Sequence, residues 1–161
     1  MAIPCCRINF IIVWFILFAL TAFTSFGQTA KSRNLNFTAA KKTVTRTGTI
    51  FPGKDGKDTA EFTFKAKKGQ KIKVALKSNK VRLGEDDYAG AVFFILDENQ
   101  NTPPDFGDYP YGGPKNWAGA LTKTGDYRIR VAMEMTSDFE DLDALKKLDL
   151  VIRYSIRVTL D

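Results

Sequence analysis

The sequence predicts an all-β protein, an antiparallel β-sandwich of jelly-roll type with seven or eight strands and one short inserted helix. Apolar and polar residues alternate along several segments of strand length. Glycine, proline, asparagine and aspartate gather between these segments, as they do in turns. One continuous apolar run, residues 91–96, also has the length of a buried strand. Together these features favour two packed sheets around one core.

Residues 58–76 show the alternation most clearly. Two runs of period two are joined by Lys68, Gly69 and Gln70, where the glycine can supply the positive φ of a short turn. This predicts a β-hairpin with an apolar face toward the core and a lysine face toward water. The residues expected to face inward are Phe62, Phe64, Ala66, Ile72, Val74 and Leu76.

Shorter patterns predict the remaining elements. Four prolines between residues 102 and 116 favour a long loop there, and the polar residues 78–90 predict an exposed loop. Ser137 and Glu140 form a capping box, with Lys146 and Lys147 at the far end, which predicts a helix over 138–147. The further strands are expected at 34–38, 44–51, 91–96, 117–121, 127–133 and 152–160.

The first 27 residues have the pattern of a signal peptide. Arg7 precedes an apolar run, and small residues follow it before Gln28. We therefore expect export to the periplasm or the medium, with residues 28–33 as a flexible leader and residues 34–161 as one domain. The alternative is an uncleaved membrane anchor, because the apolar character extends nearly to the length of a membrane span. Cys5 and Cys6 precede the apolar run, which excludes a lipoprotein acylation site after it.

The composition argues against an enzyme. The chain has no histidine, and its two cysteines lie in the predicted signal peptide. This excludes catalysis by Ser-His or Cys-His pairs and the usual zinc ligands. Acidic clusters at 85–87, 97–99 and 105–108 could hold calcium, but none has the spacing of an EF-hand loop. Because turns are rich in aspartate for backbone reasons, no cofactor or metal is expected.

Basic residues occupy many outward strand positions. Without Arg7 the chain carries 23 basic and 18 acidic residues, a net charge of about +5. These cations could form a surface for an anionic partner, or they could keep the strand faces soluble. No nucleic-acid partner is expected, because aromatic residues are not interleaved with the charges. The aromatic loop containing Phe106, Tyr109, Tyr111 and Trp117 could either bind a partner or pack over the end of the sandwich.

Four segments together resemble a known family. They are RTGTI from Arg46, DTAEFTFKAKKGQKIKVAL from Asp58, TKTGDYRIRV from Thr122 and YSIRVTL from Tyr154. This order is similar to that of the periplasmic inhibitors of goose-type lysozyme, over about residues 34–161. More broadly, the FxAKKGQK run and the GDY turn and strand resemble bacterial pre-peptidase C-terminal domains.

The resemblance implies a secreted, non-enzymatic binding protein whose loops enter the cleft of a goose-type lysozyme. Such a cleft carries catalytic carboxylates, so basic and hydroxylated side chains on stiff loops are the expected contacts. The alternative function is an adhesion or accessory domain that binds calcium or a cell-surface polymer. The candidate partner-binding residues are Arg46, Lys54, Lys57, Tyr109, Tyr111, Lys146 and Lys147.

Overall fold

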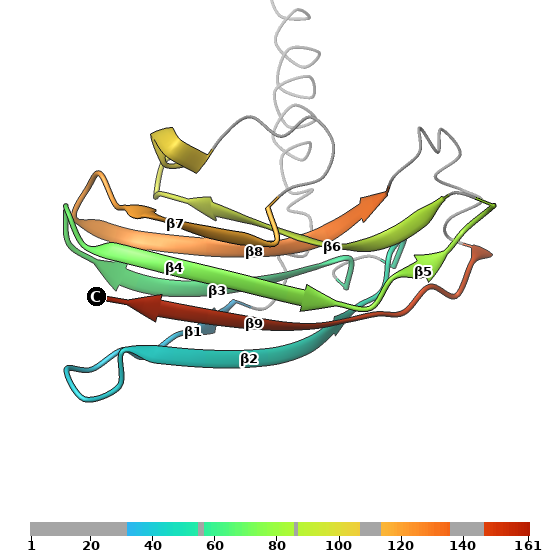
Figure 1. Cartoon of the computed structure of the whole chain (residues 1–161), viewed down its shortest axis with the longest axis horizontal. Helices are drawn as coiled ribbons and strands as arrows, with labels where there is room; N and C mark the ends of the chain where they lie inside the picture. The colour runs from blue at the N-terminus through green and yellow to red at the C-terminus, as the bar shows by residue number, and fades with distance from the viewer. Residues whose placement is uncertain (1–31, 55–56, 86, 107–113, 136–146) are drawn as a thin grey trace, which may run out of the picture.

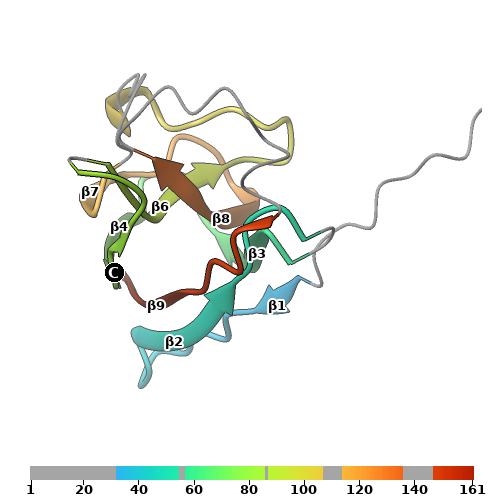
Figure 2. The same ribbon diagram turned by 90° about the vertical axis from the view of Figure 1, so that its right-hand side faces the viewer.

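A computed structural model describes residues 32–54, 57–85, 87–106, 114–135 and 147–161. Two β-sheets pack face to face, as Figure 1 and the end-on view in Figure 2 show. The fold class is therefore confirmed as a β-sandwich, with nine strands in the described residues. No helix within these residues has the length and apolar character needed to cross a membrane.

The larger sheet, here called sheet A, has the strand order β1-β3-β8-β6-β5. The strands of sheet A are β1 (Arg33–Asn34), β3 (Thr59–Ala66), β8 (Gly125–Met135), β6 (Tyr88–Leu96) and β5 (Val81–Arg82). The short β1 pairs with β3 in parallel, and the other neighbours in this sheet are antiparallel. A single 3-10 turn, η1 (Pro104–Phe106), follows β6.

The smaller sheet, sheet B, has the order β2-β9-β4-β7 and is antiparallel throughout. Its strands are β2 (Thr43–Ile50), β9 (Ile152–Leu160), β4 (Lys71–Ser78) and β7 (Asn116–Ala120). The last strand of the chain thus lies inside the sheet, between the second and the fourth strands. Sheet B is completed only when residues about 100 apart in the sequence pair with one another.

The predicted hairpin at residues 58–76 is wrong, because its two strands do not pair with each other. The residues predicted to face the core do face it. β3 pairs with β8 in sheet A, whereas β4 pairs with β9 and β7 in sheet B. The turn between them therefore carries the chain from one sheet to the other. Gly69 has φ of 84° there and donates its backbone N–H to the Leu121 carbonyl, 2.7 Å away. Lys68 donates to the Thr124 hydroxyl at 2.9 Å, so this crossing is bonded to the connection between β7 and β8, which also changes sheets.

Other elements differ from expectation mainly at their ends. The region 78–90 is not all loop, because Val81–Arg82 and Tyr88–Gly90 belong to strands β5 and β6. The first strand is Arg33–Asn34 rather than residues 34–38, although Leu35 is buried, as an apolar residue at that point should be. The predicted helix over 138–147 lies outside the described residues, apart from Lys147.

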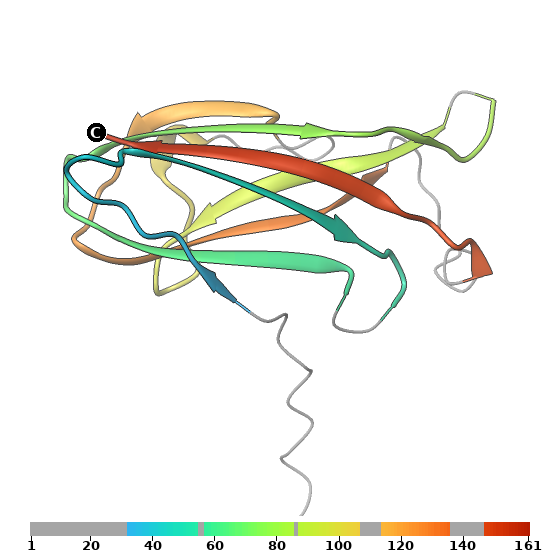
Figure 3. The same cartoon turned by 90° about the horizontal axis from the view of Figure 1, so that it is seen from below.

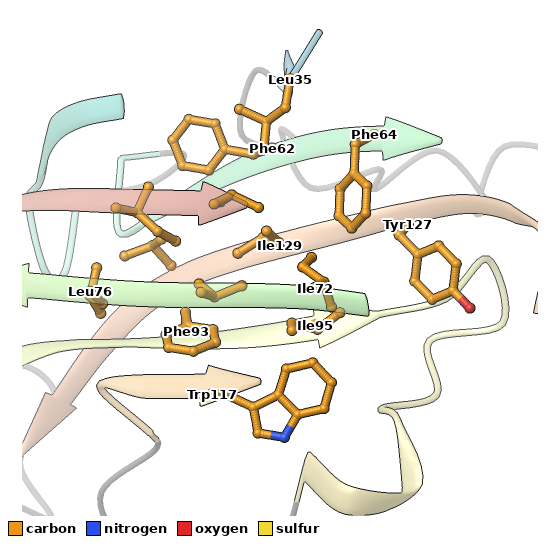
Figure 4. Packing of buried hydrophobic residues seen from close by; sticks show 14 of the residues in the cluster. Leu35, Phe62, Phe64, Ile72, Leu76, Phe93, Ile95, Trp117, Tyr127 and Ile129 are labelled. Atoms are coloured by element: carbon orange, nitrogen blue, oxygen red, sulfur yellow. The ribbon is translucent and has the colours of Figure 1, made fainter. Parts of the chain in front are cut away.

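The core fills the space between the sheets with side chains from both (Figure 4). The Phe64 and Tyr127 rings are stacked with their centroids 5.7 Å apart. Phe106 is buried and packs against Phe93 and Trp117, at centroid distances of 5.8 and 5.6 Å. Phe106 and Trp117 therefore belong to the core, which is the packing alternative for these two residues of the aromatic loop.

A candidate partner-binding end of the sandwich

Three connections lie at one end of the sandwich, on the right-hand side of Figures 1 and 3. They are the turn between β2 and β3, the connection from β4 to β6, and the segment that precedes β9. We call this the Lys54 end, consisting of residues 51–54, 57, 79–85, 87–88 and 147–151. It holds both large apolar side chains that are notably exposed among the described residues, Tyr88 at 36% and Leu148 at 41%.

The turn between β2 and β3 is closed by backbone hydrogen bonds. Phe51 donates its N–H to the Lys57 carbonyl at 2.8 Å, and Lys57 donates its N–H to the Lys54 carbonyl at 2.9 Å. Buried Pro52 and a positive φ of 74° at Gly53 fix the backbone that leads to Lys54. The turn consequently presents Lys54 and Lys57 from a defined loop.

An ion pair joins this turn to the segment before β9. The Lys54 ammonium lies 2.5 Å from an Asp149 carboxylate oxygen and 5.5 Å from the centroid of the Phe51 ring. The neighbouring ammonium lowers the pKa of Asp149, first through the hydrogen bond and then through its charge. Lys147 is two residues from Asp149 and is exposed. The structure therefore brings Lys54, Lys57 and Lys147 to the same end of the molecule.

The connection from β4 to β6 is anchored as well. The Asn79 amide donates to the Val151 carbonyl at 3.3 Å, and its side-chain oxygen accepts the Arg153 N–H at 2.6 Å. Arg82 donates to the carbonyls of Gly84 and Glu85 at 2.9 and 2.8 Å, which ties down the turn ahead of β6. These bonds hold the connection in place.

Tyr88 and its surroundings could contact a partner. The Lys80 ammonium lies 5.9 Å from the centroid of the Tyr88 ring. A groove of about 560 Å³ beside them is lined by Lys77, Ser78, Lys80, Tyr88, Lys115 and Glu134. Lys115 donates to Glu134 and to the Ala91 carbonyl, both at 2.5 Å. Tyrosine and lysine together offer apolar area with polar tips, which suits a protein surface.

The remaining candidate residues are placed differently. Arg46 lies in the middle of β2, on the side that faces the core, and donates to the Thr45 carbonyl at 3.2 Å. The four residues from Arg46 to the end of β2 separate it from the Lys54 end by about 13 Å. Tyr109, Tyr111 and Lys146 lie outside the described residues. Tyr88 and Leu148 were not expected, because β6 and the segment before β9, rather than a local sequence pattern, bring them to this end.

The acidic turn after β6 serves the fold at the opposite end. Asp97 is buried and accepts hydrogen bonds from the N–H groups of Asn99 and Asn101 at 2.8 and 2.9 Å. Its other oxygen lies 2.7 Å from the Lys123 ammonium. That hydrogen bond, helped by those from the turn, lowers the pKa of Asp97 to about 2. In the part of the chain that the structure describes, no three acidic side chains gather as a metal site would need.

The described part of the chain is thus a two-sheet β-sandwich with a firmly braced end that carries Lys54, Lys57 and Lys147. Proteins with the same fold are known. The periplasmic inhibitor of g-type lysozyme (PliG) from Aeromonas hydrophila aligns with a TM-score of 0.53 and 21% identity, over 81% of this chain and 96% of that chain. PliG from Salmonella Typhimurium aligns with a TM-score of 0.51 and 19% identity, over 83% of this chain and all of that one.

A mutant of PliG from Escherichia coli aligns with a TM-score of 0.50 and 20% identity, over 81% of this chain and 97% of that chain. At these identities the likeness extends to the fold alone. No family model matches the sequence. No curated protein matches it either.

Proposed function

We propose that this chain is a non-enzymatic inhibitor of goose-type lysozyme that acts through the Lys54 end. The supporting observation is the fold that it shares with three periplasmic inhibitors of g-type lysozyme over nearly their whole length. A glycoside hydrolase cleft carries a pair of carboxyl groups. The lysines of the Lys54 end have the complementary charge, and bracing by Asn79 and Arg82 keeps the entropic cost of binding low.

In this proposal Lys54, Lys57 and Lys147 face the acidic cleft, and Tyr88 and Leu148 contact its apolar walls. Tyr109, Tyr111 and Lys146 are proposed as further contacts. Arg46 is proposed as a separate contact, made from the edge strand rather than from the end.

The test is an inhibition assay against goose-type, chicken-type and invertebrate-type lysozymes in parallel. We expect inhibition of the goose-type enzyme alone. The double variant Lys54→Ala, Lys147→Ala should weaken that inhibition by about 10- to 100-fold, equivalent to about 1.4 to 2.8 kcal/mol. Loss of Lys54 also leaves the Asp149 carboxylate without its partner, which adds repulsion from the cleft.

The matched control removes two cations from the opposite end. Lys67 and Lys68 are exposed in the turn between β3 and β4, and both donate hydrogen bonds through their backbone N–H groups. The variant Lys67→Ala, Lys68→Ala has the same net charge as the test variant and should inhibit like the unaltered protein. Full activity of all three lysozymes at micromolar concentrations of this protein would refute the proposal.

Export to the periplasm is part of the same proposal. It is supported by the signal-like pattern of residues 1–27 and by the periplasmic location of the three inhibitors. N-terminal sequencing of the exported protein should give a start near Gln28. A protein that still begins at Met1 and needs detergent for extraction would instead support the anchor.

A further inference from the structure

The basic side chains on the outer faces of the two sheets differ in whether they form ion pairs. On sheet A three basic side chains, all on the adjacent strands β3 and β8, have acidic partners. Arg130 lies 2.8 Å from the Glu61 carboxylate, Arg128 lies 3.7 Å from it, and Lys65 lies 3.9 Å from Asp126. Glu61 is only 6% exposed although it occupies an outward position. The cations of sheet A thus help to balance charge within the fold.

Sheet B differs, although Asp161, directly after β9, pairs with Lys42 at 3.7 Å beside the sheet. None of its strands, β2, β9, β4 and β7, contains an aspartate or a glutamate. Five cations occupy outward, exposed positions on two adjacent strands, and none of the five forms an ion pair with any described residue. They are Lys71, Lys73, Lys77, Arg153 and Arg157.

The register of β4 and β9 sets these cations side by side. Arg157 is opposite Ala75, so it lies between Lys73 and Lys77. Outward residues repeat about every 6.6 Å along a strand, and neighbouring strands are about 4.8 Å apart. The result is a two-dimensional array of positive charge on a rigid support.

A shallow groove of about 410 Å³ crosses this array. The small side chains of Ala75 and Ala118 allow the surface to dip there, between the longer side chains of Lys73 and Arg157. Asn116 and Thr159 add an amide and a hydroxyl to its lining. The Thr159 hydroxyl lies 3.0 Å from that of Thr43, and it keeps capacity for another hydrogen bond.

We propose that the outer face of sheet B binds an acidic polysaccharide along this groove. Lys73 and Arg157 would pair with carboxylate or sulfate groups, Arg157 through two parallel hydrogen bonds. Asn116 and Thr159 would bind the sugar hydroxyls. The flanking cations Lys71, Lys77 and Arg153 would bind the neighbouring charges of a repeating polymer, so several weak contacts add together.

The same face is poorly suited to other polyanions. Single-stranded nucleic acid needs exposed aromatic rings for stacking. Trp117 contributes to the groove lining but is only 9% exposed, and Tyr154, the other aromatic residue of the sheet B strands, is buried. An anionic membrane is bound best when large apolar side chains accompany the charge. The exposed ones, Tyr88 and Leu148, belong to the Lys54 end instead.

The experiment measures binding of the exported protein to heparin and to polygalacturonate by isothermal titration calorimetry, with neutral dextran as the uncharged probe. We expect binding to at least one acidic polymer, weakened by salt, and none to dextran. The variant Lys73→Glu, Arg157→Glu should bind at least about tenfold more weakly. It should inhibit lysozyme like the unaltered protein, because both positions are away from the Lys54 end.

A control variant separates this face from overall charge. Lys65→Glu, Lys67→Glu makes the same change in net charge at exposed positions outside sheet B, and it should bind the acidic polymers as before. Equal weakening by both variants would overturn the proposal, because binding would then follow net charge alone. Tighter binding to phosphatidylglycerol vesicles or to DNA than to either polysaccharide would overturn the choice of partner. If the double glutamate variant does not fold, Lys73→Gln, Arg157→Gln replaces it with the same expected direction.

Discussion

Gly48 is a position where the absence of a side chain decides the packing. It lies on β2 opposite Tyr154 of β9, and the Tyr154 ring covers it. A Cβ atom at position 48 would overlap both the ring and the hydroxyl of that tyrosine. Because Tyr154 is buried, its ring cannot readily turn out to solvent to make room. The same burial raises the pKa of its phenol.

We therefore expect Gly48→Ala to reduce the free energy of unfolding by about 1 to 3 kcal/mol, as overpacking does. Urea denaturation measures this. Gly90→Ala is the matched control, because a Cβ there would find its nearest neighbour, the Ser78 hydroxyl, at an ordinary 3.7 Å. The control should stay within about 0.5 kcal/mol of the unaltered protein. Equal stability of the two variants would show that Tyr154 does not cover Gly48.

We expect the contribution of Asp97 to the free energy of unfolding to be lost in acid. Aspartate in an unfolded chain has a pKa of about 3.9. In the folded protein the Lys123 hydrogen bond lowers the pKa of Asp97 to about 2. Its stabilising effect is therefore complete above about pH 4 and is lost as the pH falls toward 2. Asp97→Asn should cost about 1 to 3 kcal/mol at pH 7. It should also make the loss of stability between pH 4 and 2 shallower.

The control for Asp97 is Asp126→Asn. Asp126 lies 3.9 Å from Lys65, and its side chain is 68% exposed, so its loss should cost less than about 0.5 kcal/mol. Thermal melts across the pH range compare the variants. An Asp97→Asn protein with an unchanged acid profile would mean that the Lys123 pair contributes nothing to stability.

At the scale of the elements, alternation predicted the faces of the strands and could not predict their partners. Phe64 and Ile72 face inward as expected, yet they belong to opposite sheets. A glycine with positive φ between two period-two runs suits a hairpin and a sheet crossing equally well. The choice depends on pairing with β8 and β9, which lie more than 50 residues further along the chain.

The same limit applied to the candidate site. Lys54 and Lys57 could be predicted because they belong to a local turn, which the proline and glycines already mark. Tyr88 and Leu148 could not, because Tyr88 reaches this end through its position on β6 and Leu148 through the segment before β9. Basic residues at outward strand positions were expected either to bind a partner or to keep the strand faces soluble, whereas Arg130, which is one of them, pairs with buried Glu61 from another strand.

The strand faces lead to a direct test on β3. Phe64 is 2% exposed, so Phe64→Ala should reduce the free energy of unfolding by about 3 kcal/mol or more. The adjacent Lys65 side chain is 88% exposed, and Lys65→Ala should change the free energy of unfolding by no more than about 0.5 kcal/mol. A greater loss from the lysine change would mean that β3 is shifted by one residue, with its faces reversed.

Across the whole molecule, stability depends on the last strand. β9 pairs with β2 on one side and β4 on the other, and it contributes Ile152, Ile156 and Val158 to the core. A chain that stops at residue 151 should therefore lose its cooperative unfolding transition, measured by circular dichroism. Adding a synthetic peptide of residues 150–161 should restore the transition in part. A truncated chain that still melts cooperatively would show that sheet A folds without sheet B.

The central position of β9 also sets the order of events during synthesis. Until β9 has been synthesised, β2 and β4 have no strand between them to pair with, so sheet B cannot assemble before residue 160 has joined the chain. Such non-local pairing folds slowly compared with local contacts. Sheet B thus forms only after every strand of sheet A has already been made.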